Sequence, residues 1–176
     1  MGSLDVAALD ALPEDAFVAA VAPWFEGAPR FLTRLAAARP FRDESTLFAR
    51  AAEIAAAMPE DEQLELIDAH PRLGAPPASV SAASFREQGY DADASAAIAD
   101  LERLNREYED RFGFRYCLFV NGRSRPELVP VLEAALGASR DAEIRRALGD
   151  VVVIARDRAT RASTRADGAR PTEVPA

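Results

Sequence analysis

The chain has 176 residues, of which 49% are hydrophobic and 28% charged, and its formal net charge is −8 at pH 7. A chain of this size forms one globular domain with a substantial core. No apolar run approaches the roughly 18 residues needed to span a bilayer, and an acidic chain repels nucleic-acid phosphates. The N-terminus lacks the basic start and apolar core of a secretory signal. We therefore expect a single cytoplasmic domain over 1–164, with no membrane or nucleic-acid partner and a disordered tail at 165–176.

The residue types that are missing exclude several chemistries. All 21 basic residues are arginines, which excludes Schiff-base catalysis, a lysine-anchored pyridoxal cofactor and a Walker-type phosphate loop. The chain has one histidine and one cysteine, Cys117, which excludes an intramolecular disulfide and any multi-cysteine metal site. These absences favour a reaction that needs neither metal nor organic cofactor.

Short Pro/Gly turns separate a series of helical patterns, so we predict an all-α fold, a single-domain helical bundle. The apolar spacing and the capping residues predict helices over 14–22, 28–38, 44–58, 60–69, 95–112, 124–136 and from 139 to about 164. Residues 114–120 are apolar and partly aromatic and lie between Gly113 and Asn121-Gly122, a composition that favours a strand. Because no partner strand is evident, we predict one extended segment near 114–120 whose backbone groups need other partners, a bound ligand being one option.

The only histidine, His70, opens the stretch 70–88, where any imidazole chemistry must take place. Pro71 disfavours helical geometry for the residue before it, so His70 is expected at the C-terminus of helix 60–69. The helix dipole favours a cation there and would raise the pKa of the imidazole. A helix-end histidine satisfied by a carbonyl or by water accounts for the same position without any catalytic role.

Two further features of the sequence have both a functional and a structural interpretation. Ser84 and Glu87 have the spacing of a capping box, which is compatible with a second role at a site. Arg158 falls within the apolar stripe of the last helix, whereas Arg156 points away from it. An inward arginine needs an anion, which is either a substrate or an internal carboxylate. Together with His70 and the extended segment, these residues favour an active site.

Five motifs occur in order along the chain: RPF at 39–41, AHPRLG at 69–74, SFREQ at 84–88, LNREYEDRFGF at 104–114 and ALGDVVVIARDR at 147–158. In these motifs the sequence, from about residue 10 to 162, resembles the decarboxylases of 2-oxo-4-hydroxy-4-carboxy-5-ureidoimidazoline (OHCU) in urate catabolism. The resemblance implies an all-α bundle that is often a homodimer. It also implies decarboxylation of the small-molecule substrate OHCU to (S)-allantoin, with no metal and no organic cofactor.

Position by position, the resemblance implies that His70 is catalytic and that Glu87 is its partner acid. The substrate-binding positions that it implies are Pro71, Ser84, Phe85, Arg86, Gln88, Tyr116, Cys117, Leu118, Phe119, Val120 and Arg158. The sequence departs from the family pattern at Arg115, where proline is usual, and at Cys117 and Phe119, where aliphatic residues are usual. The rival interpretation is a non-catalytic helical module that binds a purine-derived ligand. The presence of a proton-transfer group favours the enzyme.

Overall fold

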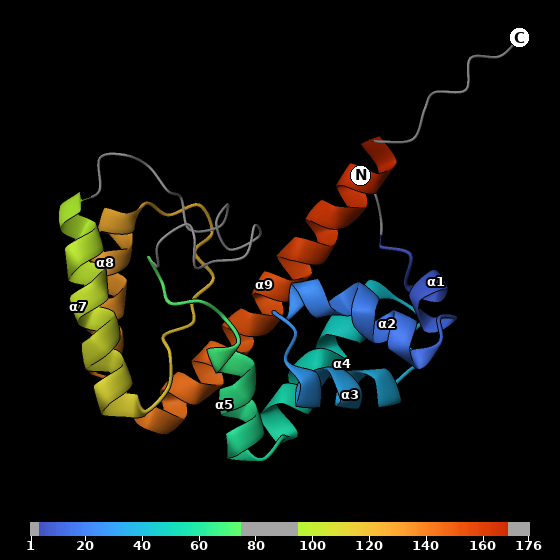
Figure 1. Ribbon diagram of the computed structural model, residues 1–176, viewed down its shortest axis with the longest axis horizontal. Coiled ribbons are helices and arrows are strands. Elements are labelled where there is room, and N and C mark those ends of the chain that lie inside the picture. The colour runs from blue at the N-terminus through green and yellow to red at the C-terminus, as the bar shows by residue number, and fades with distance from the viewer. Residues whose placement is uncertain (1–3, 75–94, 169–176) are drawn as a thin grey trace, which may run out of the picture.

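The computed structural model describes residues 4–74 and 95–168, with side chains over 4–74 and 97–164. In these ranges the chain forms eight α-helices, one 3₁₀ turn and no strand (Figure 1). The predicted all-α, single-domain fold is confirmed. None of the helices in the described part is long and apolar enough to cross a membrane.

All seven predicted helices are present, with ends close to those expected. The elements are α1 (Val6–Asp10), α2 (Glu14–Val21), η1 (Ala22–Trp24), α3 (Pro29–Ala37), α4 (Glu44–Ala57), α5 (Glu60–Asp68), α7 (Ser95–Phe112), α8 (Arg125–Ala135) and α9 (Arg140–Gly168). Only α1 and the 3₁₀ turn η1 were not predicted, because both are too short to show a helical period. Helix α9 continues through Gly168, past the predicted start of the tail at 165, and residues 169–176 lie outside the described part of the chain.

Side chains at the predicted caps define where the helices begin. The carboxylate of Asp43 accepts the backbone N–H of Thr46 at 2.7 Å, at the start of α4. Ser124 and Glu127 form the predicted capping box of α8. Each cap satisfies N–H groups that have no partner within the helix, so these local signals fix the helix starts independently of the tertiary contacts.

Helix α9 is the element on which much of the molecule packs. It runs diagonally across the molecule in Figure 1 and contacts α4, α5 and η1, while α7 and α8 lie side by side. The stripe predicted to face inward is buried, with Ile144, Leu148, Val151, Ala155 and Ala159 each at most 6% exposed. The predicted difference between the two arginines is also confirmed, because the side chain of Arg158 is 5% exposed and that of Arg156 is 58% exposed.

Residues 114–120 form no strand in the described part of the chain, although their composition favours one. Side chains take the place of a partner strand: Arg146 Nη1 donates to the carbonyl of Cys117 at 2.8 Å, and Arg123 Nη2 donates to that of Phe119 at 2.6 Å. On the other side, the ring of Tyr108 on α7 lies 4.9 Å from that of Tyr116, centroid to centroid. Arginines and an aromatic contact therefore hold this segment in place.

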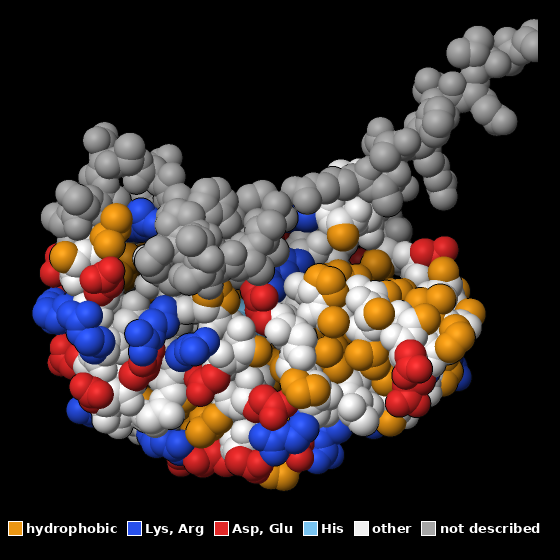
Figure 2. Space-filling model, in the orientation of Figure 1, with side chains coloured by type: hydrophobic (Ala, Val, Ile, Leu, Met, Phe, Trp, Pro, Cys, Tyr) orange, Lys and Arg blue, Asp and Glu red, His pale blue; other side chains and the backbone are white. Residues whose placement is uncertain are grey.

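Charged side chains of both signs are interspersed over the face formed by α5 and α7, whereas hydrophobic side chains gather over α1 and α2 (Figure 2). The exposed residues of these two helices include the alanines Ala7, Ala8, Ala16, Ala19 and Ala20. Among the described residues the one large hydrophobic side chain that is exposed is Val153, at 44%. The other large apolar side chains of the described residues are buried or half-buried.

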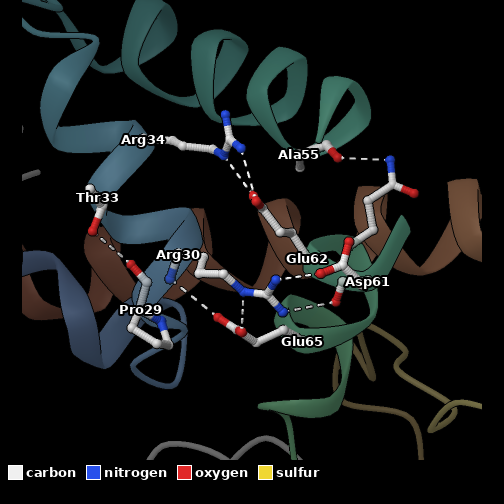
Figure 3. Close-up of polar contacts among 9 residues, drawn as sticks. Pro29, Arg30, Thr33, Arg34, Ala55, Asp61, Glu62 and Glu65 are labelled. Carbon is white, nitrogen blue, oxygen red and sulfur yellow. Dashed lines mark hydrogen bonds and ion pairs between the residues drawn. The ribbon is translucent and has the colours of Figure 1, made fainter. Parts of the chain in front are cut away.

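Ion pairs join α3 to α5, the helix that leads to His70 (Figure 3). Arg34 binds both carboxylate oxygens of Glu62, at 2.6 and 2.9 Å. Arg30 binds Asp61 and also Glu65, whose carboxylate lies 2.5 Å from Nε. Two-pronged arginine–carboxylate contacts fix orientation as well as distance, so α5 has a defined position relative to α3.

We expect Arg34→Gln to lower Tm, because it removes the two-pronged contact between α3 and α5. In about 1 M NaCl, where the Debye length is about 3 Å, the difference from the parent protein should shrink. Thermal unfolding followed by circular dichroism at low and high salt measures both effects. Arg50→Gln is the matched control, because its ion pair with Glu53 lies within α4. Equal losses of Tm in the two variants would contradict the assignment.

Candidate active site

His70 lies just beyond α5, as predicted, and is 4% exposed. Its Nδ1 atom is 3.3 Å from the carbonyl oxygen of Leu66, one turn earlier in the helix. A carbonyl oxygen can only accept a hydrogen bond, so Nδ1 carries the proton and Nε2 keeps its lone pair. Nε2 is buried and has no hydrogen-bond partner among the described residues. The structure therefore holds a neutral, oriented imidazole with one basic nitrogen unsatisfied.

The pKa of His70 is lowered from 6.5 to about 4, chiefly because burial disfavours the charged imidazolium. The positive charge of Arg158 acts in the same direction, while the carboxylate of Glu26 opposes both. The expectation that the helix end would raise this pKa is wrong. A helix dipole contributes a modest attraction, which loss of hydration outweighs when the ring is almost fully buried.

Arg158 reaches from α9 to the turn around η1. Its Nη1 donates to the carbonyls of Pro23 and Trp24 at 3.2 and 3.3 Å, and Nη2 donates to Glu26 at 2.9 Å. Glu26 adopts a left-handed backbone conformation with φ of 51°, which costs a non-glycine residue about 1 kcal/mol. An internal carboxylate, one of the two partners considered for Arg158, is therefore present.

Hydrogen bonds from Arg115 bring residues 114–120 close to His70. The backbone N–H of Arg115 donates to the carboxylate of Asp68 at 2.8 Å. Its guanidinium donates to the carbonyls of Asp68 at 2.7 Å and His70 at 3.2 Å. Residues 114–120 therefore start against the end of α5.

Arg146 on α9 holds the next part of the segment. Its guanidinium pairs with Glu143 and Asp150, each at 2.7 Å, and lies 4.6 Å from the ring centroid of Tyr116. Burial raises the pKa of Asp150, which Arg146 opposes, and burial raises the pKa of Tyr116 to about 12. Tyr116 therefore stays protonated at neutral pH.

The structure brings several of the predicted site positions together and leaves others undescribed. His70 and Arg158 interact electrostatically, and Arg115 joins His70 to the segment 116–120. Pro71, Leu118 and Phe119 are half-buried, whereas Tyr116, Cys117 and Val120 are buried. The SFREQ positions, Ser84, Phe85, Arg86, Glu87 and Gln88, lie outside the described residues, and so does the capping box predicted there.

Sequence reasoning missed Glu26 and the contacts of Arg115. A glutamate before a glycine in a Pro/Gly turn resembles a solvated turn residue, and nothing local indicates its partner on α9. Arg115 is noticeable in the sequence only as a departure from the family pattern. Within the described residues, no group of three or more His, Cys, Asp or Glu side chains is placed to hold a metal ion.

Two solved structures have the same helical fold. The chain matches a crystal structure of OHCU decarboxylase in the presence of (S)-allantoin with a TM-score of 0.65 and 19% identity, covering 78% of this chain and 93% of that one. It matches a crystal structure of (S)-allantoin synthase with a TM-score of 0.68 and 21% identity, covering 89% of this chain and 52% of that one. At these identities the likeness concerns the fold alone.

The sequence comparisons give the family. A protein from Halalkalicoccus jeotgali named 2-oxo-4-hydroxy-4-carboxy-5-ureidoimidazoline decarboxylase is 31% identical over 158 residues, 88% of this chain and 89% of that protein. One of the same name from Haloferax volcanii is 29% identical over 160 residues, 88% of this chain and 94% of that protein. The model of the OHCU decarboxylase family matches residues 10–160. The chain belongs to this family of carboxy-lyases of urate degradation.

A longer relative matches over part of its length. The uric acid degradation bifunctional protein PucL of Bacillus subtilis is 36% identical over 142 residues, which cover 76% of this chain and 28% of that protein. The chain therefore spans less than a third of the length of this relative.

Because the chain has a single histidine, an NMR titration of the imidazole reports on His70 alone. We expect a pKa near 4, and Arg158→Gln should raise it by removing a cation, whereas Glu26→Gln should lower it further. Unfolded histidine titrates near 6.5, so the folded protein binds this proton less readily and loses stability as the pH falls from about 6.5 to about 4. A titration midpoint near 6.5 in the folded protein would contradict the burial argument.

Proposed function

We propose that this chain decarboxylates OHCU to (S)-allantoin without a cofactor, with His70 transferring the proton, Glu87 as its partner acid and Arg158 binding the anionic substrate. The observation that carries the proposal is the buried, neutral imidazole of His70, with its unsatisfied Nε2 in the electrostatic field of Arg158. The proposal uses residues of this chain alone, and none from the additional length of the Bacillus subtilis relative.

The tautomer of His70 supports a sequence of proton steps. With the proton on Nδ1 and a low pKa, the free imidazole is a base, so His70 first takes the hydroxyl or ring proton of the substrate at Nε2. The bond to the carboxylate carbon then breaks, CO₂ leaves, and its electron pair delocalises into the adjacent ring as an enolate-like anion. The imidazolium returns its proton to one face of that anion, and a second proton, taken up from water, neutralises the remaining charge, which yields a single enantiomer of the neutral product.

Arg158 is suited to an anionic substrate because its guanidinium is held in one orientation. The carbonyls of Pro23 and Trp24 and the carboxylate of Glu26 fix its plane. A fixed fork of donors binds a carboxylate at a smaller entropic cost than a mobile side chain. Glu26 is the counter-ion of Arg158. The positive field of the guanidinium is therefore confined to its immediate surroundings, in a chain of net charge −8.

The 84–88 positions complete the proposed site. Nδ1 of His70 is bonded to the carbonyl of Leu66 and Nε2 is the proposed proton acceptor, so Glu87 is proposed to act through its charge, which stabilises the imidazolium once it forms. Ser84, Phe85, Arg86 and Gln88, with Pro71 and residues 116–120, are proposed to contact the substrate. The homodimer implied by the family resemblance stays a prediction, which sedimentation equilibrium can test.

We expect His70→Asn to reduce kcat by roughly 10²- to 10⁴-fold, the contribution typical of a positioned acid or base. The substrate can be made in place from urate with urate oxidase and hydroxyisourate hydrolase, and (S)-allantoin can be followed by circular dichroism. An unchanged far-UV spectrum is the control for folding. If the parent protein does not accelerate the reaction over spontaneous decay, the proposed activity is wrong.

Replacing Arg158 should impair substrate use more than folding. Arg158→Ala combined with Glu26→Ala removes both members of this ion pair, and we expect kcat/KM to fall by about 10- to 100-fold, as for loss of a charge-assisted contact. Arg156→Ala is the matched control, because that arginine is exposed on the same helix. Unchanged kinetics in the double variant would show that Arg158 has only a structural role.

A further inference from the structure

We propose that Arg115 is a positioning residue for the reaction, which holds His70 in register with residues 116–120. This inference rests on the proposed function, in which His70 transfers the proton. Arg115 is adjacent in sequence to Tyr116 and binds the polypeptide at His70 itself. It therefore links His70 directly to the segment 116–120.

Three hydrogen bonds from Arg115 converge on the end of α5. Its backbone N–H binds the carboxylate of Asp68, and Nη1 binds the carbonyls of Asp68 and His70, at 2.8, 2.7 and 3.2 Å. The last carbonyls of a helix have no partner within it, and they attract a cation. Arg115 supplies both the donors and the charge, so it acts as a C-terminal cap from a distant part of the chain.

The orientation of the imidazole depends on that last turn. His70 Nδ1 bonds to the carbonyl of Leu66, so the ring keeps its direction only while residues 66–70 stay wound. Removing the donors to Asp68 and His70 would let the turn fray and move Nε2. A displacement of about 1 Å at a reacting group can reduce the rate by about 10²-fold.

The chain beyond His70 is anchored in a different way. Arg72 pairs with Glu109 on α7, and Asn105 Nδ2 donates to the carbonyl of Leu73 at 2.8 Å. These contacts hold the turn to α7, while Arg115 holds the end of α5 beside residues 116–120. Loss of Arg115 should therefore change the angle of His70 while the turn as a whole stays attached.

Arg115 is exposed, so the effect of its removal on the orientation of His70 can be distinguished from an effect on the stability of the fold. Removing an exposed guanidinium leaves no buried charge behind, so the fold should tolerate the change. Catalysis that depends on the angle of the His70 imidazole should not tolerate the change. Two charged groups, Arg158 and Glu26, act on the pKa of His70. Both are unaltered in the variant, so a change in the pKa of the imidazole reports the loss of Arg115.

The experiment compares Arg115→Gln, Arg115→Lys and the control Arg111→Gln, an exposed arginine over the ring of Phe112. For Arg115→Gln we expect kcat to fall by about 10- to 100-fold with a much smaller change in KM. The NMR pKa of His70 should rise from about 4 toward 6.5 as water reaches the ring. Arg115→Lys keeps a cation at the helix end and should recover part of kcat, and Arg111→Gln should behave as the parent.

Parental kcat together with a parental His70 titration in Arg115→Gln overturns the inference, and so does a loss of Tm with unchanged kinetics. Failure of the proposed function looks different, because either the parent protein would not accelerate the reaction over spontaneous decay or His70→Asn would keep full activity. In that case the NMR titration of Arg115→Gln still measures whether Arg115 orients the imidazole. A shifted titration would support the positioning role, and an unshifted one would refute it.

Discussion

The structure of the candidate site depends on the burial of one imidazole beside one buried ion pair. Removing charged groups from water is costly, and among the described residues Arg158 and Glu26 offset this cost for each other, while the carbonyls of Pro23 and Trp24 accept further hydrogen bonds from Arg158. The same absence of water keeps His70 unprotonated. A base is thus prepared by desolvation, without a carboxylate from the described residues bonded to it.

Placing these groups together requires three segments that are distant in sequence. The turn at η1 supplies Glu26, α5 supplies His70 and α9 supplies Arg158. Helix α9 packs against the other two, and the ion pairs from α3 fix α5 in turn. Residues 114–120 lie against the end of α5 and against α9 as irregular chain. Because arginine side chains satisfy carbonyls of this segment, the fold can present an extended backbone without a sheet.

The fold could be read from the sequence because its signals are local. Apolar spacing and caps such as Asp43 and Ser124 gave the helices, and the same period placed Arg158 inward. The site was harder to predict from the sequence, because the pKa of His70 depends on burial by residues that are distant in the chain. The local dipole argument gave the wrong direction for the pKa of His70, and Glu26 sits in a left-handed turn with no signature of a partner on α9. Contacts across tens of residues, such as Arg115 with His70, have no periodic pattern at all.

A low pKa in the free protein suits the proposed reaction because the substrate changes it. An anion bound beside Arg158 offsets the cation that helps hold His70 neutral, so the pKa of the imidazole rises on binding and proton uptake becomes easier. CO₂ leaves as a neutral molecule, so the electron pair of the broken bond and its negative charge stay on the ring and make its carbon basic. The imidazolium is then again disfavoured by burial, which drives its proton onto the carbon. Desolvation and substrate charge together would move the proton in both directions without a second titrating base.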